Sequence, residues 1–82
     1  ANEPEKVELA FAIYPNPVSE KLYATGKNIS KVSKVEVYDI SGKLLQIIPK
    51  AFENNNYIDV SSYRSGVYFI VIDGVSYKFI KK

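Results

Sequence analysis

The sequence VYFIVIDGVSYKFI, residues 67–80, places an Asp-Gly pair between two runs that are typical of β-strands. An Asp-Gly pair in this setting favours a two-residue hairpin turn of type I′, because both residues tolerate a positive φ. Residues 67–72 are apolar at every position, as expected for a central strand that is covered on both faces, or on one of them by a partner. Residues 75–82 instead alternate between two faces. The C-terminal part of the chain is therefore predicted to be a β-hairpin.

The rest of the chain shows the same period-two hydrophobic pattern, interrupted at short intervals by turn residues. Further strands are predicted at residues 10–14, 21–25, 34–40, 44–48 and 57–60. Seven short strands in about 80 residues are typical of an immunoglobulin-like sandwich. The predicted fold is therefore all-β: a seven-stranded immunoglobulin-like β-sandwich over residues 9–82, preceded by a polar linker at residues 1–8.

The segments between the strands are rich in residues that end strands. Pro15-Asn16-Pro17 stops the first strand, because proline has no backbone N–H to donate. Ser41-Gly42-Lys43 is a predicted turn and residues 53–56 a polar loop. Residues 27–31 are predicted to be a loop, and residues 61–66 a compact connection with room for one 3₁₀ turn.

The composition excludes several classes of function. The chain has no cysteine and no histidine, which removes thiolate nucleophiles, Ser-His pairs and the preferred ligands of transition metals. The net charge of +2 and a single arginine, Arg64, argue against nucleic-acid binding. No run of 18 apolar residues is present, and neither a transmembrane segment nor a signal peptide is expected. We therefore predict no enzymatic activity, no catalytic residue, no cofactor and no metal.

The acidic residues are the remaining candidates for a catalytic or ion-binding site. Asp39, Asp59 and Asp73 could meet Glu20 or Glu36 in a carboxylate pair, but each Asp lies at a strand end or turn, where local hydrogen bonding favours it. The Asn-rich loop at residues 54–56 does not have the spacing of a calcium-binding loop. Both features are interpreted as structural.

Two further features have a structural and a functional interpretation. Seven tyrosines could form a sugar-binding or protein-binding row, although packing in the core and at strand edges is preferred. Asn28-Ile29-Ser30 matches the glycosylation triplet, a pattern that often arises by chance.

Several motifs in a fixed order point to a known family. They are YPNPV at residues 14–18 with Lys21-Leu22, VEVYDISGK at residues 35–43, Ile58-Asp59-Val60, SGVYFIV at residues 65–71, and a final lysine-rich strand. Together they resemble the type A C-terminal sorting domain of the type IX (Por) secretion system of Bacteroidetes, over residues 8–82. One departure is Tyr63, where the family pattern usually has leucine, and an apolar contact could survive this change.

The resemblance implies a function without catalysis. Domains of this family follow an N-terminal passenger, such as a protease, another hydrolase or an adhesin. They direct it from the periplasm through the outer-membrane translocon, with the help of a shuttle protein. A sortase then removes the domain, and the passenger is anchored at the cell surface or released. The cut would lie at or before residues 1–8.

The resemblance also suggests which residues matter. The expected sorting signal consists of Gly66, Val67, Tyr68, Lys78, Phe79, Ile80, Lys81 and Lys82. The expected structural motifs are Pro15, Asn16, Pro17, Gly42, Asp73 and Gly74. A lysine-rich last strand also has a simpler explanation, because lysines blunt an edge strand against aggregation. Alternative functions are an adhesive or carbohydrate-binding accessory module of a larger secreted enzyme, and a structural spacer.

Overall fold

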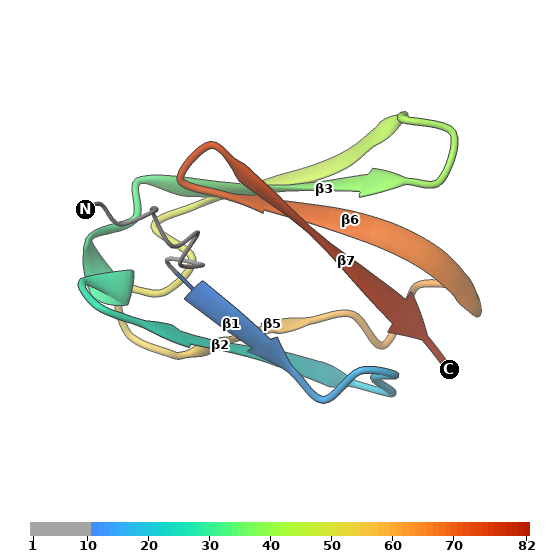
Figure 1. Ribbon diagram of the computed structural model, residues 1–82, viewed down its shortest axis with the longest axis horizontal. Helices are drawn as coiled ribbons and strands as arrows, with labels where there is room; N and C mark the ends of the chain where they lie inside the picture. The colour runs from blue at the N-terminus through green and yellow to red at the C-terminus, as the bar shows by residue number, and fades with distance from the viewer. Residues whose placement is uncertain (1–10) are drawn as a thin grey trace, which may run out of the picture.

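The computed structural model describes residues 11–82, which form two antiparallel sheets packed face to face (Figure 1). One sheet has three strands in the order β1-β2-β5, and the other has four in the order β4-β3-β6-β7. The strands are β1 Phe11–Tyr14, β2 Lys21–Gly26, β3 Lys34–Asp39, β4 Leu44–Pro49, β5 Tyr57–Asp59, β6 Gly66–Ile72 and β7 Val75–Lys81. The predicted seven-stranded β-sandwich is confirmed.

The predicted strands agree with the observed ones to within one residue at nearly every end. One local expectation was wrong: the connection at residues 61–66 contains bends and turns and no 3₁₀ helix. The 3₁₀ turn is η1, Ile29–Lys31, in the segment predicted to be a loop. It follows Asn28, whose φ of 63° is left-handed, a conformation that asparagine tolerates better than most residues. The linker predicted at residues 1–8 lies outside the described residues.

The β6–β7 hairpin has the predicted turn. Asp73 and Gly74 have φ values of 54° and 82°, the positive values that a type I′ turn requires at both central positions. Ile72 pairs with Val75 across this two-residue loop. The turn sets the register of the ladder, and hence which residues of β7 face the core.

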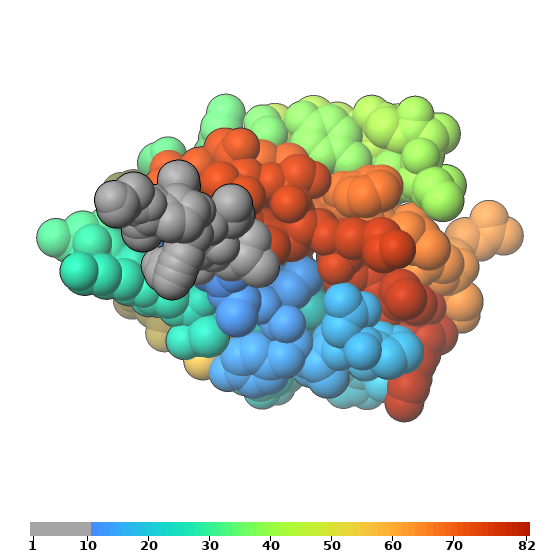
Figure 2. All heavy atoms as spheres, in the orientation of Figure 1, coloured from blue at the N-terminus to red at the C-terminus, as the bar shows by residue number. Residues whose placement is uncertain are grey.

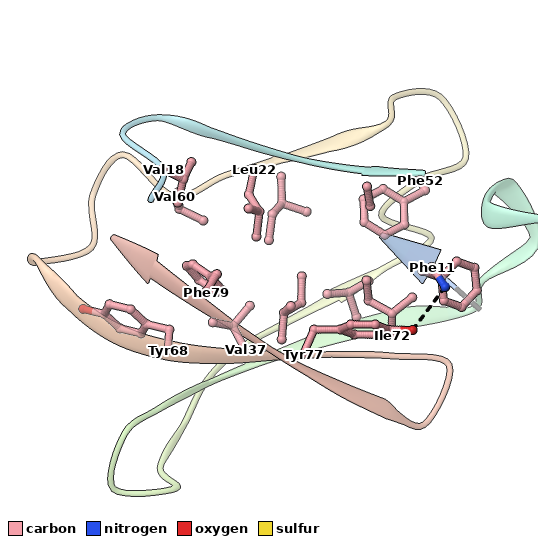
Figure 3. Close-up of a cluster of buried hydrophobic side chains, with 14 of the residues drawn as sticks. Phe11, Val18, Leu22, Val37, Phe52, Val60, Tyr68, Ile72, Tyr77 and Phe79 are labelled. Carbon is pink, nitrogen blue, oxygen red and sulfur yellow. Dashed lines mark hydrogen bonds between the residues drawn. The ribbon is translucent and has the colours of Figure 1, made fainter. Parts of the chain in front are cut away.

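The core lies between the sheets and alternates along each strand. Val37, Ile70 and Phe79 of the four-stranded sheet are completely buried and face Leu22 and Val60 (Figure 3). At the other end of the core, the hydroxyl of Tyr77 accepts a hydrogen bond from the backbone N–H of Phe11 at 3.2 Å. The core therefore depends on side chains from both ends of the described chain.

The segment between β1 and β2, two strands of the three-stranded sheet, hydrogen-bonds to β7 of the four-stranded sheet. The side chain of Asn16 accepts a hydrogen bond from Ile80 N–H at 2.8 Å and donates one to the Lys78 carbonyl at 3.2 Å. Val18 N–H donates to the Ile80 carbonyl, and Lys82 N–H donates to the Val18 carbonyl, both at 2.8 Å. We call residues 15–18 the strap; in Figure 2 this part of the chain, in blue, lies against the red spheres of the C-terminal strand.

The strap generates the first prediction. Asn16→Ala removes both side-chain hydrogen bonds to β7 and should lower the free energy of unfolding by about 1 kcal/mol. In a domain of this size that corresponds to a fall in melting temperature of about 4–8 °C. Thermal unfolding followed by circular dichroism measures it. Asn55→Ala, in the exposed polar loop, is the matched control and should change little; equal melting temperatures for the two variants would contradict the role of the strap.

A second prediction concerns the largest fully buried side chain, Phe79. Phe79→Ala leaves a cavity and should cost about 3–5 kcal/mol, much of the stability of a small domain. Ile80→Ala, at the next position but on the exposed face, should cost far less. Chemical denaturation of the two variants compares them, and similar losses would show that β7 does not alternate as described.

Candidate recognition surface

The β6–β7 ladder brings together the residues that the sequence assigned to the sorting signal. Its register pairs Gly66 with Lys81, Val67 with Ile80, and Tyr68 with Phe79. These residues are therefore neighbours at one end of the ladder, although the two groups are about ten positions apart in the sequence. The strap contacts the same end of β7.

The inward side of this ladder is an aromatic stack. The ring centroids of Tyr68 and Phe79 are 5.5 Å apart, and those of Tyr63 and Tyr68 are 5.1 Å apart. Tyr63 packs against the core, so the apolar contact expected there is present, and its hydroxyl donates to Gln46 Oε1 at 2.6 Å. Burial, and then the neighbouring Tyr68, raise the pKa of the Tyr63 hydroxyl. Tyr68 and Phe79 thus support this end of the sandwich from inside and do not contact solvent freely.

The three lysines of the last strand do not form one cluster. Lys78 is exposed, and so is Lys82, whereas Lys81 is only 9% exposed and lies on the inward face with Phe79. The Lys81 ammonium is 3.4 Å from the carbonyl of Lys82. The solvent-facing residues of the expected signal are therefore Val67, Lys78, Ile80 and Lys82, which we call the terminal patch.

The strap limits how a partner can contact the terminal patch. Backbone groups of Lys78, Ile80 and Lys82 on the outer edge of β7 are already bonded to Asn16 and Val18. In this conformation a partner strand has no free ladder to join at this point. The groups that remain available to a partner here are side chains: two ammonium groups and the apolar surface of Ile80, which is 40% exposed.

A shallow cleft continues from the terminal patch. Its lining includes Asp39, Ile40, Arg64 and Val67. The Tyr68 hydroxyl donates to the Arg64 carbonyl at 2.7 Å, which fixes the backbone beside the cleft. Ile40 is 70% exposed. Ile40 and Arg64 were not among the residues predicted for the site; the available signals were a lone arginine and an apolar residue in a polar turn.

The other predicted motif residues, Gly42, Asp73 and Gly74, lie in turns. Gly42 has a φ of 90° in the β3–β4 turn, where Asp39 Oδ1 accepts hydrogen bonds from Ser41 N–H, Ser41 Oγ and Lys43 N–H at 2.6–2.9 Å. Asp73 and Gly74 lie at the opposite end of the ladder, away from the terminal patch.

The acidic residues behave as turn residues. Asp59 Oδ1 accepts from Ser61 N–H at 2.9 Å. Hydrogen bonds from Ser41 hold the pKa of Asp39 below its usual value, and hydrogen bonds from Ser61 do the same for Asp59. Within residues 11–82 no group of three or more acidic residues is placed to hold a metal ion. Asp39 and Asp59 thus make the local turn hydrogen bonds that the sequence favours.

Most tyrosines lie in or against the core or in one surface row; Tyr38 is the exception, half-buried on β3, where its hydroxyl donates to Glu36 Oε1 at 3.3 Å. Tyr68 and Tyr77 are buried, in line with the packing expected from the sequence. Tyr14, Tyr23 and Tyr57 form a cross-strand row on the outer face of β1-β2-β5, with ring centroids 5.6 and 5.5 Å apart. Lys21 Nζ lies 4.9 Å from the centre of the Tyr57 ring. Tyr14, at the edge, is 45% exposed.

Among residues 11–82 no helix has the length and apolar character needed to cross a bilayer. No solved structure matches the chain. One relative, beta-agarase A of Zobellia galactanivorans, is 29% identical over 76 residues, which are 93% of this chain and 14% of the agarase. The chain thus spans about one seventh of the length of that relative.

The family comparison covers nearly the whole chain. The family described as the secretion system C-terminal sorting domain matches residues 12–82, a range that contains the strap, the β6–β7 ladder and the terminal patch. The matched range also contains every structural motif on which the resemblance was based. The chain therefore belongs to the family of type IX secretion C-terminal sorting domains, found in Bacteroidetes.

Proposed function

We propose that this domain directs a passenger protein, joined ahead of it, through the outer-membrane translocon of the type IX system. Family membership supports a sorting role and export to the cell surface or beyond. The observation that carries the finer proposal is the terminal patch, where two exposed lysines and Ile80 lie on β7 and just after its end, in a segment that the strap holds in place. A translocon component or shuttle protein binds this patch.

The proposal includes the steps before and after translocation. The passenger, a hydrolase, protease or adhesin, reaches the periplasm first and is carried outward by way of the folded domain. A sortase cuts in or before residues 1–8, after which the passenger is anchored or released. The domain itself has no enzymatic activity and no cofactor. It acts only by being recognised.

The carbohydrate-binding alternative has one observation in its favour, the tyrosine row. Its geometry does not suit a sugar platform, which needs ring faces open to solvent. The planes of Tyr14 and Tyr23 lie within 13° of each other with centroids 5.6 Å apart, so each ring covers part of its neighbour. The row fits cross-strand pairing that stabilises a three-stranded sheet. The sorting role is therefore preferred.

A fusion experiment tests the proposed function. A fluorescent reporter with a general export signal, fused ahead of residues 1–82, should reach the surface or the medium in a host with the type IX machinery. The reporter without the domain should stay in the periplasm. Cell fractionation measures both. Retention of the fused reporter, together with tight binding of the purified domain to a glycan array, would favour the carbohydrate-binding alternative.

Substitutions in the same fusion test the terminal patch. Lys78→Gln with Lys82→Gln removes its two exposed charges and should lower export about tenfold, the effect of losing 1.4 kcal/mol of binding. Changes of surface charge shift stability by only about 0.5 kcal/mol, so the melting temperature should barely move.

Lys27→Gln with Lys31→Gln is the matched control, because both lysines are exposed; Lys27 precedes η1 and Lys31 is its last residue. Normal export of this control is expected. Normal export of the patch variant together with increased aggregation would mean that the lysines only protect an edge.

A further inference from the structure

The two edge strands of the four-stranded sheet, β7 and β4, differ in whether another segment covers their outer side. The β7 edge is covered by the strap along residues 78–82, as described above. The β4 edge is the other end of the strand order, and within residues 11–82 no strand or loop hydrogen-bonds to its outer side. In Figure 1 the yellow-green β3–β4 hairpin forms the margin of the molecule away from the three-stranded sheet. An uncovered edge of six residues is a template for pairing with another strand.

The ladder geometry shows which backbone groups of β4 are free. Lys50 N–H donates to the Ser33 carbonyl at 2.8 Å, so these two residues form a hydrogen-bonded pair. Such pairs alternate in an antiparallel ladder, and the amides of Ile48 and Gln46 must also face β3. The N–H and carbonyl of Ile47 therefore face outward. Pro49, which has no N–H, occupies another outward position, where a proline is tolerated.

The side chains of β4 are apolar where an edge strand is usually charged. Leu44, Leu45 and Ile47 are 42%, 39% and 49% exposed. Natural edges are commonly protected by a charge within the strand. A register shift opposite Val37 and Tyr38 disturbs the ladder near Leu44, which leaves residues 46–49 as the regular part of the edge.

The charges at the ends of β4 indicate what can pair with it. Lys43 and Lys50 are both exposed and flank the apolar strand. Antiparallel pairing of β4 with a second copy of this chain would bring Lys43 of one copy close to Lys50 of the other at both ends. Like charges at such positions are destabilising. Acidic residues on both sides of an apolar segment would be attracted instead.

We propose that β4 is a strand-addition site for an extended segment of another protein, apolar in the middle and acidic at both ends. The segment pairs antiparallel with residues 46–49 through the outward groups of Ile47 and the Pro49 carbonyl, and its acidic ends lie near Lys43 and Lys50. This mode of recognition uses main-chain hydrogen bonds for affinity and side chains for specificity. The proposal does not rest on the sorting role, because it concerns a different edge from the terminal patch.

A peptide titration of the 82-residue chain, followed by amide hydrogen exchange in NMR spectra, tests the site. The probe is a synthetic peptide of alternating Val and Thr with two Glu at each end, added to millimolar concentration. Exchange of the Ile47 amide should slow at least about tenfold, equivalent to 1.4 kcal/mol of protection. The Ile48 amide, already bonded to β3, should be protected throughout. The same peptide with Lys in place of Glu should give no protection.

Two variants keep the test specific. Ile47→Lys places a charge at the centre of the edge and should abolish the protection. Val75→Lys makes the same change at a residue of similar exposure, 40%, on the far strand of the sheet and should leave it intact. Matching melting temperatures would show that both variants fold.

Three outcomes would overturn the proposal. They are no protection of Ile47 by the acidic peptide, equal protection by the two peptides, or protection of Ile47 in the free chain that rises with protein concentration. The last result, with a dimer in sedimentation, would identify a second copy as the occupant.

Discussion

The position of the last strand, and with it the terminal patch, depends on the hydrogen bonds between Asn16 and the backbone of β7. Packing between two sheets is driven by the removal of apolar surface from water, which is strong but has little directionality. Hydrogen bonds from the strap to Lys78 and Ile80 have fixed partners and therefore fix the position of the last strand relative to the first corner of the chain. Val18, completely buried, adds a core contact at the same point. The strap thus links the two sheets and closes the β7 edge along residues 78–82.

The same strand, β7, contributes both to the core and to the surface proposed for recognition. Because β7 alternates, Phe79 and Lys81 face inward and Lys78 and Ile80 face outward on the same strand. A change on the inward side alters stability first, and a change on the outward side alters the surface presented to a partner. Loss of export in a variant of β7 has a clear meaning only when stability is measured beside it.

Most of the fold could be predicted from the sequence because the deciding signals are local. Period-two alternation located the strands, and Asp73-Gly74 fixed the register of the last hairpin. Two of the failures were non-local. Nothing local to Pro15-Asn16-Pro17 indicates that its asparagine binds a strand more than 60 positions away, and the cleft between Asp39 and Arg64 exists only because two turns meet. The displaced 3₁₀ turn depends on the left-handed conformation of Asn28, which several other residues could also have adopted.

The lysines of the last strand are an intermediate case. Lys78, Lys81 and Lys82 look like one basic cluster when they are counted along the sequence, yet the period of two already separates the odd-numbered lysine from the even-numbered ones. Lys81 lies on the inward face because Phe79 does, and it is only 9% exposed. The sequence therefore already separated the inward lysine from the two outward ones. The separation was missed because the three lysines were counted together as one basic cluster.

The two edges of the four-stranded sheet make different demands on a partner. At the terminal patch only side chains are available, so a folded surface with acidic groups and an apolar area can bind without changing its own structure. At β4 the free main-chain groups require a segment that is already extended and unpaired, or that becomes so on binding. Contacts between exposed charges weaken with salt, whereas main-chain hydrogen bonds respond much less. The ionic-strength dependence of a complex thus indicates which edge of the sheet it uses.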